Sequence, residues 1–303
     1  MEAKQLCNEP LSLLEISNAL KEMALDKSPG PDGLTTNFYK CFWDDLKQPL
    51  LDSYLFAFKH GELADGQRRG ILNLIPKRDK DLRYLKSWRP VSLLATDYKI
   101  LAKALAIRLQ KVISSLVHPD QVGYIKGRYI GENIITINDL IQTSSIYQKP
   151  GILALIDFEK AFDTVEWSFL FETLETFDLG KNFATWIRLL YTNISSCITN
   201  NGYISNYFPL SRGIRQGCPI SALLFILVAE ILSINVRSDA SIKGITIKET
   251  EFKMAQLADD TTVFLALFMF PIVYLRQLTN YSLISNGQAN PKNKEEYNHK
   301  RIW

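Results

Sequence analysis

Three aspartates occupy places where carboxylates could hold divalent metal ions. Asp157 ends a short apolar run that begins at residue 152, and Asp259 and Asp260 separate two strand-like runs, 252–257 and 261–265. A buried strand that ends in a carboxylate delivers it to a sheet edge, and two acids between strands would lie at a hairpin tip. Asp157 and Asp259 are 102 positions apart (259 − 157 = 102), but adjacent strands would bring the three acids together.

Carboxylate oxygens are the ligands that hard cations prefer. Two such cations about 4 Å apart can activate a hydroxyl group and neutralise the leaving group in a displacement at phosphorus. Each acid also has a plainer explanation, because a strand-ending aspartate can cap a turn and acids are common in turns. The order and the flanking residues of the motifs must therefore decide between these readings.

The elements around these acids mix strands and helices. Residues 195–200 and 206–210 resemble paired strands around Asn201-Gly202, a strong hairpin signal. The other predicted elements are helices at 11–23, 38–60, 98–117 and 166–191 and from Ile220, and strands at 71–75 and 88–94. This order predicts an α+β fold with helices packed on one face of a sheet.

Composition sets broad limits. The 303 residues are 47% hydrophobic, enough to bury the core of one or two domains. The net charge of +3 is too small to indicate nucleic-acid binding by itself. The four cysteines lie far apart, without the close pairs of zinc sites or a secreted disulfide framework, which favours a reducing compartment.

No signal peptide is evident at the N-terminus. Two apolar runs, 220–236 and 263–275, are shorter than the ~20 residues of a spanning helix. The first contains Glu230 and the second Pro271. We therefore expect buried core segments and no membrane association, with an intracellular location in the nucleus, the cytoplasm or both.

Local basic residues carry the case for an anionic ligand. A helix face with Lys99, Lys103, Arg108 and Lys111 could be solvated or could follow a phosphate backbone. Likewise, the loop that holds Lys126 and Arg128 could approach phosphates or form a surface turn. Arg212 and Arg215 could add phosphate contacts, but nothing distinguishes them from ordinary surface charge.

Seven ordered motifs resemble the reverse transcriptases of non-LTR (LINE-type) retrotransposons. Palm motifs A, B and C correspond to ALIDFEKAFDTV (154–165), GIRQGCPISALLF (213–225) and LADD (257–260). The finger motifs correspond to SPGPDG (28–33), LIPK (74–77), WRPVSLL (88–94) and HPDQVGY (118–124). Together they span about residues 10 to 266, and their order makes coincidence improbable.

The resemblance implies roles for the acids and for one aromatic residue. Asp157, Asp259 and Asp260 would be catalytic and would bind two Mg²⁺ ions, or Mn²⁺, together with the main-chain carbonyl of Phe158. Phe162 would lie under the incoming sugar, where it would clash with a 2′ hydroxyl. An ordinary core phenylalanine is the alternative for Phe162.

The resemblance also implies a nucleotide site made of Lys77, Arg89, Gln216 and Gly217. Lysine and arginine suit a triphosphate because one is a compact charge and the other a bidentate fork. A glycine in the Gln216-Gly217 loop would let the main chain approach the nucleotide. Surface solvation of the cations and a simple helix-entry turn are the plainer alternatives.

By resemblance the chain is a right-hand polymerase with an antiparallel palm sheet. Its fingers with an N-terminal extension would occupy 1–150, the palm 151–266 and a degenerate or disordered tail 267–303. Leu257 replaces the usual Phe or Tyr of the family, which alters packing beneath the hairpin but keeps the acids. No thumb is recognisable, and residues 282–294 match the following family segments only weakly.

The leading hypothesis is an RNA-directed DNA polymerase that copies an RNA template from a DNA primer with dNTPs. The oligomeric state is unknown. Without a thumb, a catalytically inactive remnant or nucleic-acid-binding module is the alternative. A third possibility is another metal-dependent enzyme, such as an RNA-templated RNA polymerase or a carboxylate nuclease, and Phe162 argues against ribonucleotide substrates.

Overall fold

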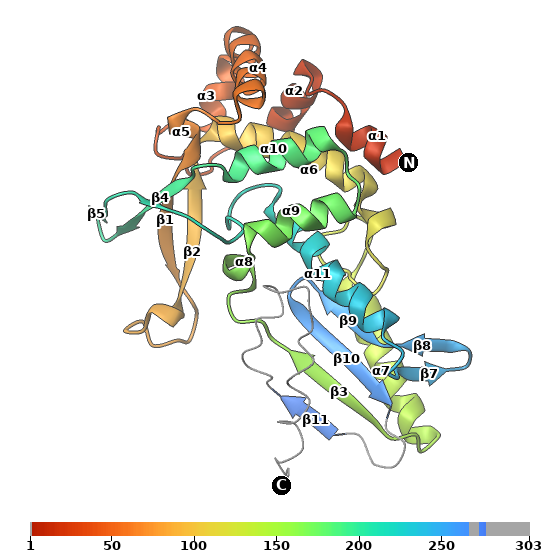
Figure 1. The fold of residues 1–303 in the computed structure, drawn as a ribbon. Helices are drawn as coiled ribbons and strands as arrows, with labels where there is room; N and C mark the ends of the chain where they lie inside the picture. The colour runs from red at the N-terminus through yellow and green to blue at the C-terminus, as the bar shows by residue number, and fades with distance from the viewer. Residues whose placement is uncertain (1, 267–272, 277–303) are drawn as a thin grey trace.

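The computed structural model describes residues 2–266 and 273–276 (Figure 1). The tail predicted for 267–303 lies outside the described residues except for a strand, β11 (Val273–Arg276). The described chain mixes helices with two larger sheets and a short hairpin, β7 (Ile245–Ile247) and β8 (Thr250–Phe252). This confirms the α+β prediction at the level of a sheet with packed helices.

The N-terminal half contributes a layer of helices at the top of Figure 1. Its members are α1 (Glu2–Asn8), α2 (Leu13–Glu22), α3 (Thr36–Cys41), α4 (Trp43–His60), α5 (Asp65–Arg68) and α6 (Thr96–Leu116). A capping box of Ser12 and Glu15 starts α2. The single helix predicted over 38–60 is only partly right: α4 ends at His60 as predicted, but Phe42 leaves helical geometry (φ −104°, ψ 23°) and separates α3 from α4.

The first sheet joins segments that are distant in sequence. Strand β1 (Arg69–Pro76) pairs antiparallel with β2 (Trp88–Leu94) and parallel with β4 (Ser195–Asn200). A short 3₁₀ turn, Leu85–Ser87, precedes β2. The predicted 195–210 hairpin is only partly right: β4 pairs first with β5 (Tyr203–Ile204) beside the turn and then with β6 (Phe208–Pro209).

The second sheet carries the predicted acids. Its order is β11-β3-β10-β9, with β3 at Gly151–Ile156, β10 at Asp260–Ala266 and β9 at Met254–Leu257. The pairs β3–β10 and β10–β9 are antiparallel, as expected, whereas β11 runs parallel to β3. A long helix, α7 (Ile130–Ile146), covers part of this sheet through Leu140, which packs with Leu153 and Phe264.

The remaining helices connect the two sheets. They are α8 (Ala161–Thr164), α9 (Trp167–Thr176), α10 (Lys181–Tyr191) and α11 (Ser221–Ser238). Among the described helices, α11 alone is long and apolar enough to cross a membrane, and 50% of that stretch is buried inside the fold. Leu224, Ile226 and Leu227 are fully buried, which is typical of a core helix. Of the second apolar run, 263–266 lies in β10.

Candidate active site

The three predicted acids meet at one end of the second sheet. Thr261 of β10 pairs with Ile156 of β3. Asp260 precedes Thr261 and Asp157 follows Ile156, so both lie at the same end of the sheet. Asp259 lies in the adjoining turn and is half-buried. Burial raises the pKa of the Asp259 carboxyl group, and the negative charges of Asp260 and Asp157 raise it further.

This arrangement suits a cation whose other ligands come from the substrate. Among residues 2–266 and 273–276, no three acidic, histidine or cysteine side chains form a complete metal-binding group. Mg²⁺ does not need one, because it is usually bound by one or two carboxylates, by substrate phosphates and by water. Asp157 and Asp260 are exposed, and a cation would relieve the repulsion at Asp259. The donor set therefore fits a substrate-completed magnesium site.

The turn that carries Asp259 has an unusual main chain. Leu257 pairs with Asp260, so Ala258 and Asp259 form a two-residue hairpin turn. Ala258 is buried and left-handed, with φ +56°, a conformation that glycine, asparagine or aspartate usually provides in such turns.

Phe162, five positions after Asp157, packs against the helical core. After Asp157 the chain turns through Lys160, which is left-handed (φ +53°), into the short helix α8. The partly buried ring of Phe162 stacks on Phe225 of α11, with 4.4 Å between ring centroids and 20° between planes. The carbonyl of Phe162 accepts a hydrogen bond from the Ile214 amide at 2.7 Å.

The Gln216-Gly217 loop joins this region to the first sheet. The Gln216 side chain donates to Oδ1 of Asp163 at 3.1 Å, and the Gln216 carbonyl accepts from the Ser92 amide at 2.8 Å. Gly217 has φ +106°, and a Cβ atom there would lie 2.6 Å from the Ser92 carbonyl oxygen. The close approach to β2 therefore requires glycine at position 217.

The two predicted cations share the far part of the β1–β2 hairpin. Arg89 pairs with Ile75 across the strands, and the Lys77 amide donates to the Ser87 carbonyl at 2.8 Å. Arg89 is exposed and Lys77 partly exposed. In the described part of the chain neither forms an ion pair, and no contact joins them to the aspartates.

Three other basic residues have structural roles instead. Arg108 is buried and pairs with Glu15 while also donating to carbonyls of the α1–α2 connection. Arg128 donates to four main-chain carbonyls between Ser114 and Gln121. Arg215 is buried and donates to the carbonyls of Arg68 and Ser195. Arg108 and Arg215 are buried, so neither is a surface cation available to a phosphate backbone.

Sequence reasoning missed two residues at the site. Asp163, six positions after Asp157, accepts a hydrogen bond from the Gln216 side-chain amide. Burial raises the pKa of the Asp163 carboxyl group, although the Gln216 hydrogen bond opposes this shift. Its place in the 154–165 motif was the signal. Gln121 bonds to the main chain of Ala258; it lies in the 118–124 motif, which marks the segment but not the contact that its glutamine makes.

Comparison with known proteins identifies the family. A model described as reverse transcriptase (RNA-dependent DNA polymerase) matches residues 75–267. The chain is 38% identical over 259 residues to the "Transposon TX1 uncharacterized 149 kDa protein" of Xenopus laevis, covering 85% of this chain and 20% of that protein. It is 26% identical to the Pol polyprotein of retrotransposable element R2DM from Drosophila melanogaster, covering 80% and 22%, and 27% identical to that of element R2 from Popillia japonica, covering 83% and 34%.

The chain thus spans between a fifth and about a third of the length of these relatives. The family match, by contrast, covers more than half of the chain and includes the strands with the three aspartates, the Gln216-Gly217 loop and the β2 contact. The resemblance to reverse transcriptases of non-LTR retrotransposons is confirmed, and the chain belongs to the reverse transcriptase (RNA-dependent DNA polymerase) family.

Proposed function

We propose that this chain supplies the fingers (1–150) and palm (151–266) of a retrotransposon RNA-directed DNA polymerase. The observation that carries the proposal is the position of three carboxylates at one end of the sheet, after β3 and at the β9–β10 turn, where Asp157 and Asp260 repel the charge on Asp259. A dNTP with its metal ions would supply the missing positive charge. The proposed reaction adds a deoxynucleotide to the 3′ hydroxyl of a primer paired with an RNA template.

Asp157, Asp259, Asp260 and the Phe158 carbonyl would hold two Mg²⁺ ions, which Mn²⁺ could replace. When bound, the ions lower the pKa of the 3′ hydroxyl and neutralise the leaving pyrophosphate. The attacking oxygen forms a bond to the α-phosphorus as the bond to pyrophosphate breaks. The carboxylates fix the geometry of this in-line displacement, and pre-positioning of the reactants lowers the barrier.

The nucleotide would be held by residues from the β1–β2 hairpin, from α8 and from the loop before α11. Lys77 and Arg89 would bind the triphosphate through charge-assisted hydrogen bonds. The Gln216-Gly217 main chain would lie against the nucleotide, held in place by Asp163 and Ser92. The ring of Phe162, supported by Phe225, would lie under the sugar and exclude a 2′ hydroxyl.

A basic hollow of about 670 Å³ next to this site would hold the template backbone. It lies between α6, the start of α11 and the loop before α7, and its lining includes Lys111, Lys126, the exposed ring of Tyr124, and Lys103 paired with Glu22 of α2 at 2.9 Å. Cations that follow a phosphate backbone, with an aromatic ring for base stacking, suit a single strand. Lys99 and Arg108 are not among its lining residues.

Primer extension on an RNA template with dNTPs and Mg²⁺ tests the proposal. Asp259→Asn with Asp260→Asn should abolish extension, because the pair supplies the cation ligands. The matched control is Asp44→Asn with Asp45→Asn, which neutralises an exposed aspartate pair at the start of α4 and should leave extension intact. A folded, RNA-binding wild type that does not extend the primer would instead favour an inactive remnant.

A further inference from the structure

The segment 118–123 braces the turn that carries Asp259. The Gln256 amide of β9 donates to the Asp120 carbonyl at 2.8 Å, and the Val122 amide donates to the Gln256 carbonyl at 3.0 Å. These bonds place Gln121 alongside β9 in parallel orientation. The segment thus extends the second sheet beyond β9, directly beside the hairpin.

The hydrogen bonds of the Gln121 side chain go to the main chain of this hairpin and of its own loop. Its Oε1 accepts hydrogen bonds from the amides of Ala258 at 2.8 Å and Gly123 at 2.9 Å. Its Nε2 donates to the Ala258 carbonyl at 3.2 Å. Gln121 is 1% exposed, so these bonds are shielded from water. One amide group therefore satisfies both main-chain polar groups of Ala258.

Ala258 needs this support because of its conformation. A left-handed main chain brings the Cβ of an alanine too close to the following carbonyl, and the buried amide and carbonyl of Ala258 would be costly if left unpaired. Asp259 is the next residue, so the dihedral angles of Ala258 set the direction of the Asp259 carboxylate. Gly123 allows the approach, since a Cβ there would lie 2.5 Å from the Ala258 nitrogen.

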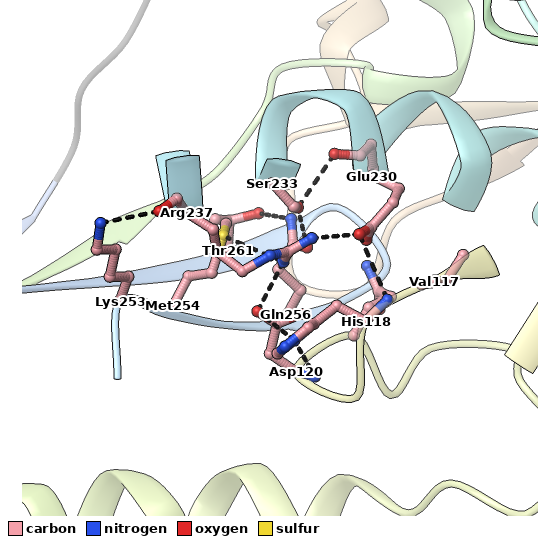
Figure 2. Close-up of polar contacts among 12 residues, drawn as sticks. Val117, His118, Asp120, Glu230, Ser233, Arg237, Lys253, Met254, Gln256 and Thr261 are labelled. Carbon is pink, nitrogen blue, oxygen red and sulfur yellow. Dashed lines mark hydrogen bonds and ion pairs between the residues drawn. The ribbon is translucent and has the colours of Figure 1, made fainter. Parts of the chain in front are cut away.

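A polar network ties the segment 118–123 to helix α11 and to the hairpin (Figure 2). Arg237 of α11 binds the Asp120 carboxylate at 2.8 Å and also pairs with the buried Glu230. The Gln256 side chain accepts from Ser233 at 2.6 Å and donates to Thr261 at 3.1 Å. The segment that presents Gln121 is therefore tied to the core helix α11.

We propose that Gln121 is a positioning residue, which holds the Ala258-Asp259 turn so that the Asp259 carboxylate faces Asp157. The inference rests on the proposed polymerase function. A purely structural glutamine would stabilise the fold without affecting cation affinity. A positioning glutamine must affect the turn, the cation affinity and the turnover together.

The test uses Gln121→Met, which keeps the side-chain length and removes the three side-chain hydrogen bonds to Ala258 and Gly123. We expect amide exchange of Ala258, measured by NMR, to become at least about tenfold faster, and Mn²⁺ affinity, measured by electron paramagnetic resonance, to fall by about 10–100-fold, the usual effect of losing a residue that orients metal ligands. The kcat of primer extension should fall by a similar factor. Ala258→Gly in the same chain should restore part of each loss, because glycine adopts φ > 0 freely.

The matched control is Gln67→Met, which removes a buried glutamine bonded to Ala64 and Asp97 far from the acids. It should lower the melting temperature without changing Mn²⁺ affinity. If Gln121→Met does not fold, Gly123→Ala replaces it, because its Cβ would push the turn away and should weaken Mn²⁺ binding in the same way. Unchanged Ala258 exchange and Mn²⁺ affinity in a folded variant would overturn the inference. Both measurements remain decisive if the wild type extends no primer, an outcome that would count against the polymerase proposal alone.

Discussion

Replacing Gly217 with alanine should destabilise the fold more than the same change at Gly202. Both glycines have positive φ, +106° and +81°, and a left-handed main chain costs alanine about 1–2 kcal/mol. At Gly202, on the β4–β5 turn, an added Cβ would have no neighbour within 4 Å. At Gly217 it would lie 2.6 Å from the Ser92 carbonyl oxygen, 0.4 Å inside the 3.0 Å that Cβ contacts respect (3.0 − 2.6 = 0.4).

Relief of that overlap requires the loop to move away from β2. The buried Ser92 amide would then lose its 2.8 Å hydrogen bond to Gln216, which adds about 1–3 kcal/mol. We therefore expect a loss of ~2–5 kcal/mol for Gly217→Ala against ~1–2 kcal/mol for Gly202→Ala. Urea unfolding of both variants measures the difference.

The same movement would displace the Gln216 side chain, so the KM for dNTP should rise in Gly217→Ala and stay unchanged in Gly202→Ala. The stability comparison stands even without measurable activity. Equal losses of unfolding free energy in the two variants would refute the close approach of Gly217 to β2, and with it the link between the two sheets.

Three further outcomes are expected. Phe162→Val should lower the preference for dNTP over rNTP by roughly 10–100-fold, and unchanged selectivity would remove Phe162 from the sugar site. Arg108→Met should lower the free energy of unfolding in urea by about 3–5 kcal/mol, because Glu15 and three main-chain carbonyls lose their hydrogen-bond donor. A loss below about 1 kcal/mol would contradict this. Burial opposes the shift, but Arg108 and Ser12 lower the pKa of Glu15 below its ordinary 4.5. The wild type should therefore be more stable than Glu15→Gln, with the full difference in unfolding free energy above pH ~5 and a smaller one as the pH falls through the lowered pKa. A difference independent of pH would contradict this.

The sequence contained enough to predict the acids and their strands. An apolar run that stops at Asp157, and an acidic pair between two runs, are local patterns, and pairing of the runs follows from their burial. The register of Thr261 with Ile156 is the structural counterpart of that expectation. The α+β class followed in the same way from the alternation of short strands with longer helices.

Other features could not be read from local pattern. Arg108 lies on an amphipathic helix, where a basic residue usually faces solvent, and its burial depends on carbonyls about a hundred positions away. Helix α7, by contrast, was missed although Ile134, Ile137 and Ile141 recur at helical spacing; only Leu140 and Ser144 of its 17 residues are buried. The role of Gln121 depends on a contact 137 positions along the chain, which no periodicity encodes.

The contacts that assemble the site are mostly made by main-chain atoms. Ser92 and Gln216 meet through an amide and a carbonyl, Phe162 and Ile214 meet in the same way, and Gln121 grips the amide and carbonyl of Ala258. Such contacts constrain where the chain runs more than which side chains it carries. Glycines are needed where two segments approach too closely for a Cβ, so motifs that contain them are recognisable in sequence. Which motif contacts which other motif is not recognisable in this way. The hairpin turn after Leu257 follows the same logic, because the Gln121 side chain holds it through the main chain of Ala258.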